Sequence, residues 1–303
     1  MISVHRTVLL NETIEGLNLP ARAGGSEKPT VIDCTFGGGG HSQAICEKYP
    51  GVKIFALDQD KSVWEKAQMK FEKFGKKCDV TFLNANFRDV AKLRDMPQAD
   101  GIIFDLGLSS DQLENSERGF SFIRREPLLM TMKENPSPED LTAEDIVNTW
   151  SEKSLADIIY GYGEERFSRR IARAIVERRQ EKKIETTRDL VEIIEGSVPA
   201  AYRRGKRHCA TKTFQALRMA VNDELGALKD GLGGAFEKLK PGGRMAVISF
   251  HSLEDRIVKN FYKEKKAEGE AVLINKKPII PSESETKENP RSRSAKLRIL
   301  QKQ

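Results

Sequence analysis

Short apolar runs and amphipathic stretches alternate along the first hundred residues of the chain. The apolar runs have the length of buried strands, and the stretches between them repeat apolar positions three and four apart, as helices do. We predict strands at 30–34, 52–57, 80–83 and 101–104, and helices at 42–48, 61–74 and 89–94. This order predicts a parallel sheet with helical crossovers, and therefore an α/β fold.

The pattern changes after about residue 116 and returns after about residue 216. Between these points no strand is predicted, and the chain after Pro138 carries three or four helical patterns. The α/β pattern then resumes with helices at 216–239 and 253–264, strands at 245–250, 271–274 and 296–300, and a loop over 276–293. Because these few strands cannot form a parallel sheet alone, we predict one sheet domain, residues 1–115 and 216–303, interrupted by an inserted helical domain, residues 116–215.

A glycine-rich turn follows the first predicted strand. Gly37 to Gly40 stand between Asp33 and a helix start, and glycine lets the backbone adopt φ > 0 and approach a ligand closely. The free amide groups of a helix start favour a negative group. The next strand ends in Asp58, where doubly wound folds place an acidic residue that accepts hydrogen bonds from ribose hydroxyls. A nicotinamide dinucleotide and S-adenosylmethionine both satisfy this pattern.

The fourth predicted strand leads into Asp105 and a loop that reaches Gln112. Ligands of open α/β sheets bind beyond the carboxyl ends of the strands, so this loop is expected beside the cofactor. Asp105 and Gln112 can offer hydrogen bonds to an adenine or to a reacting amine. The run Lys240-Pro-Gly-Gly243 between a helix and a strand is typical of S-adenosylmethionine-dependent enzymes, and it favours methyl transfer over hydride transfer.

Charge is distributed unevenly along the chain. Lys and Arg number 51 against 45 Asp and Glu, a net charge of +6 that is compatible with a polyanionic partner. Basic residues gather in three clusters, at 166–183, at 203–212 and from 287 onward. The four cysteines form no CxxC pair and the four histidines have no metal-ligand spacing, so no metal site is predicted.

The apolar content also bears on location. No apolar stretch approaches the roughly 20 residues that span a membrane, and the N-terminus has no signal-peptide core. We expect a cytoplasmic protein with reduced cysteines and no membrane partner. The sequence pattern sets no oligomeric state.

Seven sequence blocks carry a more specific signal. They are Asp33-Cys-Thr-Phe-Gly-Gly-Gly-Gly-His-Ser42, Asp105-Leu-Gly-Leu-Ser-Ser110, Arg118-Gly-Phe-Ser-Phe122, Tyr162-Gly-Glu-Glu165, Ala210-Thr-Lys-Thr-Phe-Gln-Ala-Leu-Arg218, Ser249-Phe-His-Ser-Leu-Glu-Asp-Arg-Ile-Val-Lys259 and Asn289-Pro-Arg-Ser-Arg-Ser294. In this order, and over nearly the whole chain, they resemble the MraW/RsmH family.

The resemblance implies a fold, a reaction and a partner. The fold is the Rossmann-like sheet of class I methyltransferases, and the reaction is methylation of N4 of a cytidine in the decoding centre of bacterial small-subunit (16S) ribosomal RNA. The implied methyl donor is S-adenosylmethionine, and the implied partner is that RNA within an assembled or late-assembling small ribosomal subunit. The resemblance places the cofactor against Gly39, Gly40, His41, Asp58, Phe87, Asp105 and Gln112.

Methylation of an exocyclic amine needs positioning more than a protein nucleophile, because the sulfonium is already activated. Asp105, with the loop through Ser109 and Ser110, is the candidate for holding N4. Methylation at C5 would instead need a cysteine nucleophile, and no cysteine lies in this loop. A paired cytosine would have to be flipped out of its helix.

One block departs from the family pattern. The family usually reads Pro-Leu-Asp-Met-Arg-Met where this chain has Pro127-Leu-Leu-Met-Thr-Met132, so Leu129 and Thr131 replace an acid and a base. If that pair holds the target nucleotide, substrate choice or rate differs here; if it is a structural ion pair, its replacement costs little. We expect retained activity. A methyltransferase for another RNA or for a protein, and a non-catalytic assembly factor that keeps the fold, are the alternatives.

The inserted domain is expected to hold the RNA backbone without reading a base. A helix is predicted over 164–179, with Phe167 and Ile171 on its apolar face and arginines on the other. Phosphate contacts are predicted for Arg166, Arg169, Arg170, Arg173, Arg203, Arg204 and Arg207. A solvated charged face is the alternative for each cluster.

Overall fold

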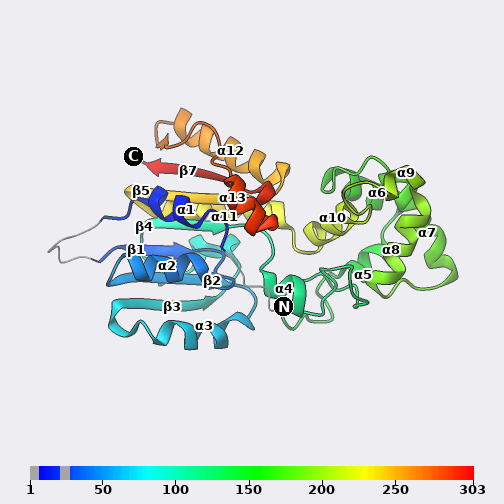
Figure 1. The fold of residues 1–303 in the computed structure, drawn as a ribbon, viewed down its shortest axis with the longest axis horizontal. Helices are drawn as coiled ribbons and strands as arrows, with labels where there is room; N and C mark the ends of the chain where they lie inside the picture. The colour runs from blue at the N-terminus through cyan, green and yellow to red at the C-terminus, as the bar shows by residue number, and fades with distance from the viewer. Residues whose placement is uncertain (1–6, 21–27) are drawn as a thin grey trace. The chain divides into compact units, whose positions relative to one another are not determined.

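The structure is a computed structural model that describes residues 7–20 and 28–303 (Figure 1). The chain forms two compact units. The first contains the residues up to Leu108 together with Leu225–Gln303, and the second is Ser109–Glu224. The change from one unit to the other therefore falls a few residues before position 115 and a few residues after position 216.

The first unit is built on a seven-stranded sheet with the order β3-β2-β1-β4-β5-β7-β6. Its strands are β1 (Thr30–Asp33), β2 (Val52–Asp58), β3 (Cys78–Asn84), β4 (Ala99–Asp105), β5 (Leu239–Ser249), β6 (Ala271–Leu273) and β7 (Lys296–Lys302). Strand β7 runs in the opposite direction to the other described strands, so its pairings with β5 and β6 are antiparallel and the rest are parallel. The strand order reverses direction between β1 and β4, and α/β folds bind ligands at the carboxyl ends of the strands at such a point. The predicted Rossmann-like fold is confirmed.

Helices cover both faces of this sheet. Successive strand residues point to opposite faces, so Ile103 packs in one core with the helices α1 to α3, while Ile102 and Phe104 pack in another with α11 and α12. The helices of this unit are α1 (Leu10–Leu17), α2 (Gly40–Lys48), α3 (Val63–Glu72), α11 (Glu224–Lys238), α12 (Ser252–Ala267) and α13 (Glu283–Glu288), with 3₁₀ segments η1 (Gly75–Lys77), η2 (Phe87–Lys92) and η3 (Pro290–Ser294).

The second unit is helical. It contains α4 (Ser110–Asn115), α5 (Ala143–Thr149), α6 (Glu152–Gly161), α7 (Ser168–Glu181), α8 (Thr187–Ser197), α9 (Ala200–Arg203) and α10 (Thr211–Val221). Within this unit, whose residues are all described, the one pairing of extended chain is a bridge between Pro127 and Thr186. The absence of a predicted strand between 116 and 214 is therefore correct.

The helix predicted over 216–239 is wrong, because two helices occupy this stretch. The side chain of Asn222 ends α10, since its Nδ2 donates to the carbonyl oxygens of Arg218 and Met130 at 2.8 Å each. Asp223 then adopts a left-handed conformation with φ of 44°. Helix α11 begins only after this turn.

The helix predicted from residue 164 begins four residues later. Glu164 is left-handed, with φ of 50°. The buried carboxylate of Glu165 accepts the Phe167 amide at 2.8 Å, which holds the chain in a turn. Arg166 and Phe167 therefore precede helix α7 and do not lie on its two faces as predicted.

Other differences concern short segments. The Lys240–Gly243 run is part of β5, and the strand passes it with a register shift opposite Ala99–Gly101. Helix α13 and segment η3 lie in the stretch that was expected to be a loop, and α1 was not predicted.

The expectation of reduced cysteines is also wrong. Cys46 of α2 and Cys78 of β3 form a disulfide, with their Cα atoms 5.3 Å apart. Cys34 and Cys209 are free and buried. Among the described helices, none has the length and apolar character that crossing a membrane requires.

Candidate functional site

The glycine turn joins β1 to α2 and is closed against its own neighbours. Gly39 has φ of 67°, and a Cβ there would lie 2.5 Å from the Phe36 ring. A Cβ on Gly40 would lie 1.8 Å from the Thr7 hydroxyl. Both positions exclude a side chain, so only glycine fits this turn as it stands. The cofactor contacts of the two glycines stay a prediction.

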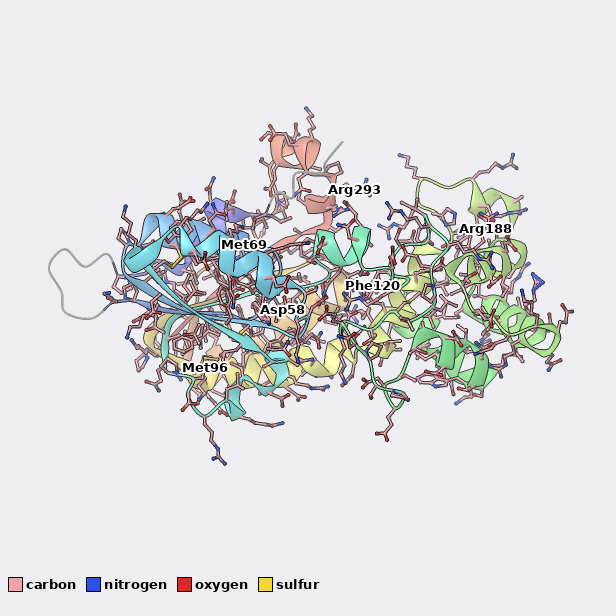
Figure 2. The ribbon with its side chains drawn as sticks, turned by 90° about the horizontal axis from the view of Figure 1, so that it is seen from below. Asp58, Met69, Met96, Phe120, Arg188 and Arg293 are labelled. Carbon is pink, nitrogen blue, oxygen red and sulfur yellow. A yellow bond between two sulfur atoms is a disulfide. The ribbon has the colours of Figure 1, made fainter. Side chains whose placement is uncertain are left out.

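Asp58 ends β2, at the carboxyl edge of the sheet (Figure 2). Its Oδ2 accepts the Gly37 amide at 2.8 Å, and its Oδ1 accepts the Asp60 amide at 2.9 Å. Burial raises the pKa of this carboxyl to about 6. Asp58 thus fixes the glycine turn, and its remaining lone pairs are available to ribose hydroxyls.

Asp33 ends β1 and was not singled out as a site residue in the sequence. Its Oδ2 accepts the Ser42 hydroxyl at 2.6 Å, which joins the strand end to the first turn of α2. Burial raises its pKa to about 6. An acidic residue at the end of the first strand was the signal for it.

Asp105 ends β4 and is the most perturbed of these carboxyls. Its amide donates to the Thr35 hydroxyl at 2.6 Å, and its Oδ2 lies 3.7 Å from Nδ1 of His41. Oδ1 is buried and accepts no hydrogen bond from the part of the chain that the structure describes. Burial, followed by the charges of Asp33 and Glu254, raises the pKa of Asp105 to about 8. The group is therefore mostly protonated at neutral pH when no ligand is bound.

The three aspartates form one acidic cluster, which we define as Asp33, Asp58 and Asp105. They end three neighbouring strands, β2, β1 and β4, at the switch point of the sheet. The charge of Asp33 raises the pKa of both of the others. Such a cluster stabilises a cation and repels a diphosphate, which agrees with the preference of the sequence for S-adenosylmethionine over a nicotinamide dinucleotide.

Phe87 begins η2 and packs against α11. Its ring meets that of Phe104 edge-on, with 5.5 Å between centroids. The ring also packs against Gly231 of α11, where a Cβ would lie only 2.6 Å from it. This accounts for an aromatic residue here by packing alone. Contact of Phe87 with a cofactor stays a prediction.

Ser109 and Gln112 belong to the second unit and cap its first helix together. The Ser109 hydroxyl accepts the Gln112 amide at 3.1 Å, and Gln112 Oε1 accepts the Ser109 amide at 3.0 Å. Ser110 opens α4, and its side chain lies outside what the structure describes. The roles predicted for these three residues in catalysis and cofactor binding stay predictions.

Leu129 and Thr131, which replace the acid and the base usual in the family, both take part in local hydrogen bonds. Thr131 is buried, and its hydroxyl accepts the Lys133 amide at 3.2 Å. The carbonyl of Leu129 accepts the Ala143 amide at 3.1 Å. Both contacts lie in the segment before α5, and the effect of the missing ion pair stays a prediction.

The arginines of the second unit that are predicted to bind RNA form a basic region, which lies just before and in α7 and at and after the end of α9. Phe167 and Tyr202 meet edge-on with centroids 4.9 Å apart, so the cluster before and in α7 lies beside the cluster that follows Tyr202. The seven arginines predicted to bind RNA are all exposed. Arg173 lies 3.7 Å from Glu152, whereas Arg166 stacks over the two aromatic rings.

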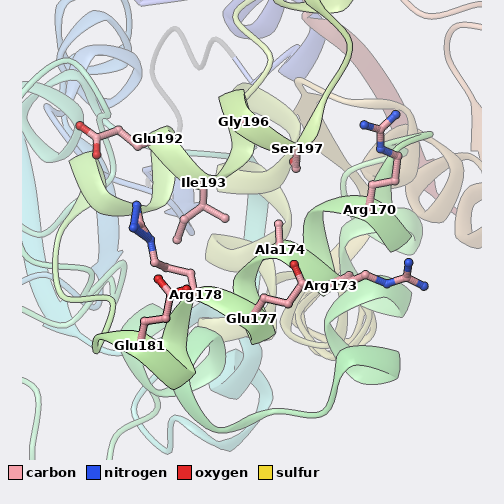
Figure 3. Close-up of a pocket in the computed structure, with 10 residues that line it drawn as sticks. All are labelled: Arg170, Arg173, Ala174, Glu177, Arg178, Glu181, Glu192, Ile193, Gly196 and Ser197. Carbon is pink, nitrogen blue, oxygen red and sulfur yellow. The ribbon is translucent and has the colours of Figure 1, made fainter.

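A groove runs between α7 and α8 (Figure 3). Arg170 and Arg173 extend to the same side at one end of it, near Gly196 and Ser197 of α8. The rest of its lining carries both signs of charge, from Glu177, Arg178, Glu181 and Glu192. A phosphate is therefore favoured only at the Arg170 end.

Comparison with known proteins gives three findings. The model of the MraW methylase family matches residues 2–303. Two relatives named Ribosomal RNA small subunit methyltransferase H are each 44% identical to this chain: that of Paenibacillus sp. (strain JDR-2) covers 98% of this chain and 99% of its own, and that of Brevibacillus brevis covers 98% of each. The crystal structure of an rRNA methylase from Streptococcus thermophilus matches 99% of this chain and 98% of its own, with 10% identity and a TM-score of 0.44.

Proposed function

Because the chain belongs to the MraW methylase family, we propose that it methylates N4 of a cytidine in the decoding centre of small-subunit ribosomal RNA. The family resemblance predicted from the sequence blocks is confirmed. The methyl donor is S-adenosylmethionine, which supplies an activated methyl group on a sulfonium when bound. The names of both relatives support small-subunit ribosomal RNA as the substrate.

The acidic cluster fits this cofactor. Its carboxyls would attract the sulfonium and the ammonium group, while the positive end of the α2 dipole suits the single carboxylate of the methionine part. Asp58 keeps lone pairs for a ribose. A diphosphate would meet three acidic groups at the same edge, which argues against a dinucleotide.

The observation that carries the N4 assignment is the state of Asp105. Its Oδ1 is buried without a described partner, so it gains a hydrogen bond when an amine arrives. The amine becomes cationic as the new N–C bond forms, and a carboxylate beside it stabilises that charge. Asp105 would thus orient N4 and favour the transition state.

The cysteines argue against C5 chemistry. That reaction needs a thiolate nucleophile. Burial, reinforced by Asp33, raises the pKa of the Cys34 thiol well above its usual range, and burial raises the pKa of Cys209 as well. Cys46 and Cys78 are joined in the disulfide. No cysteine of the chain is therefore poised as a nucleophile.

The second unit would bind the RNA. The arginines around α7 and α9 would bind the phosphates of the RNA backbone. The substrate we propose is an assembled or late-assembling small subunit, in which the folded RNA presents the decoding-centre cytidine. Ser109, Ser110 and Gln112 begin this unit, so they would connect RNA binding to the cofactor-binding unit along the chain.

The test is methyl transfer to small subunits purified from bacteria that lack this modification, followed by mass spectrometry of the nucleosides. We expect N4-methylcytidine at one position. The matched control is Asp105→Asn, which keeps the shape of the side chain. Formation of 5-methylcytidine, methylation of protein or of another RNA, or no transfer at all would overturn the proposal, and the last result would favour an assembly factor without chemistry.

A further inference from the structure

The basic region contains one arginine, Arg166, whose guanidinium lies over two aromatic rings. The Cζ of Arg166 lies 4.7 Å from the centroid of Phe167 and 4.9 Å from that of Tyr202. Arg169, three residues further along the chain, has no such contact in the described residues. The side chain of an exposed arginine ordinarily keeps its rotamer freedom. A guanidinium that lies over two aromatic rings gives up part of that freedom, so we interpret this contact as a specific feature of the fold.

We propose that Arg166, Phe167 and Tyr202 form a platform on which an unpaired base of the RNA stacks. The proposal rests on the proposed function only in taking RNA as the partner. The ligand is a nucleobase of any identity, because stacking uses the π face that all bases share. The platform would therefore contact a base without reading the sequence.

A buried carboxylate holds the platform in place. Oε1 of Glu165 accepts the Phe167 amide at 2.8 Å, and Oε2 accepts the Tyr202 hydroxyl at 2.5 Å. Glu165 is completely buried. One side chain thus fixes the backbone beside one ring and the hydroxyl of the other, although Phe167 and Tyr202 are 35 positions apart in the sequence.

The geometry favours a base over a phosphate at this position. The Cζ of Arg166 lies over both rings, while the residue as a whole is exposed. The free face of a guanidinium plane is a surface on which unstacked RNA bases are held. A phosphate would be bound as well by any extended arginine, and the aromatic support would add nothing to it.

The neighbouring charges suit the sugar-phosphate backbone that a stacked base brings with it. Arg170 lies 6.0 Å from the Phe167 ring, and Arg203 and Arg204 directly follow Tyr202. The site therefore combines one stacking surface with cations around it. This combination is the one that single-stranded nucleic acids require.

The experiment compares two short unstructured RNAs that have the same phosphates, one with bases and one with abasic riboses. Binding is followed by fluorescence anisotropy across a salt series. We expect the natural protein to bind the base-bearing strand about tenfold more tightly. Arg166→Lys keeps the charge and loses the planar group, so this preference should vanish while the salt slope stays unchanged.

Two further variants make the result specific. Arg169→Lys is the matched control, and its preference for bases should equal that of the natural protein. Tyr202→Phe keeps the ring and loses the bond to Glu165, so its preference should fall only in part. Thermal melting close to that of the natural protein shows that each variant is folded.

Three outcomes would overturn the platform. They are equal binding of both RNAs by the natural protein, equal behaviour of Arg166→Lys and Arg169→Lys, and absence of any RNA binding. The last would also contradict the proposed function. A protein that prefers base-bearing RNA but methylates no cytidine would support the platform and contradict only the proposed reaction.

Discussion

The acidic cluster of the first unit and the basic region of the second differ in burial as much as in charge. Asp33, Asp58 and Asp105 end parallel strands, and burial is the main cause that raises their pKa values to about 6, 6 and 8. The arginines are exposed, in or beside α7 and α9, where solvent and salt screen them. Ligand binding by the acidic cluster should therefore depend mainly on pH, and RNA binding by the basic region mainly on salt concentration.

This difference in burial and charge predicts different functions for the two regions. A buried group acts through its fixed position and through its protonation state, because a low local dielectric strengthens every interaction it makes. Exposed cations act through their number. Changes in the acidic cluster should affect cofactor binding and the chemical step, whereas changes in the basic region should affect RNA binding.

The largest expected effect belongs to Asp105. Asp105→Asn keeps the shape but removes the negative charge that stabilises the methylated amine, so kcat should fall about 10² to 10³-fold. Binding of RNA particles should stay unchanged. Single-turnover methyl transfer at saturating cofactor measures the first, and a particle-binding assay the second. A variant with nearly normal kcat would remove Asp105 from the mechanism.

Asp58 should come next. Asp58→Ala removes the acceptor for ribose hydroxyls, and a charged acceptor contributes roughly 1.5–3 kcal/mol, so S-adenosylmethionine should bind about tenfold to a hundredfold more weakly. Calorimetry gives the affinity. Asp58→Asn, which keeps one oxygen for the Gly37 amide, should lose less. Unchanged affinity in both variants would place the ribose elsewhere.

The pH dependence of cofactor binding should show the charge of the acidic cluster. Below pH 8 the free site holds a proton on Asp105, whose pKa is about 8, and a bound cation favours the ionised carboxylate. Binding of S-adenosylmethionine then releases a proton, so affinity should rise about tenfold from pH 6.5 to 8 and level off above it.

S-adenosylhomocysteine is the control for this measurement, because it lacks the sulfonium charge. Its affinity should change less over the same range. Calorimetry in buffers of different ionisation enthalpy counts the protons released. Equal pH profiles for the two ligands would mean that the cluster does not face the sulfonium.

The salt dependence of binding to small subunits should show the contribution of the basic region. Replacing both Arg169 and Arg170 by Ala should weaken binding to small subunits, because fewer phosphates are neutralised. The slope of log affinity against log salt should fall by about one unit for each phosphate that the variant no longer binds. Affinity for S-adenosylmethionine should stay the same. A normal slope together with normal particle binding would mean that these arginines form a solvated charged face and do not bind RNA.

The smallest effect is expected from restoring the family pair. Leu129→Asp together with Thr131→Arg should leave turnover within about tenfold, roughly 1.4 kcal/mol, if the pair is structural. The assay is methyl transfer on particles, with each single variant alongside because an unpaired charge at buried Thr131 should destabilise the fold. A much larger gain would show that the natural protein is impaired or has another substrate.

The sequence predicted the sheet well, because short apolar runs between helical patterns leave few alternatives. It failed where a single side chain decides the local backbone. Asn222 ends α10 through its amide, and the carboxylate of Glu165 delays the start of α7. Neither hydrogen bond has a periodicity, so a pattern of apolar positions cannot predict it.

The candidate site was predicted in part for the same reason. Asp58 and Asp105 follow from the rule that ligands bind at strand ends. Their coupling to Asp33 depends on which strands are neighbours, and that order is a tertiary property. The contact of Phe167 with Tyr202 likewise joins two basic clusters that the sequence keeps apart.

The division of work between the two regions is tested most directly by one single-turnover titration of small subunits with three proteins: natural, Asp105→Asn, and the Arg169/Arg170 double alanine variant. The account predicts that Asp105→Asn lowers the maximal rate of N4-methylcytidine formation and leaves the half-saturating particle concentration unchanged. It predicts the reverse for the double variant, a normal maximal rate with weaker saturation. Loss of maximal rate in the arginine variant, or weaker saturation with a normal maximal rate in Asp105→Asn, would contradict it.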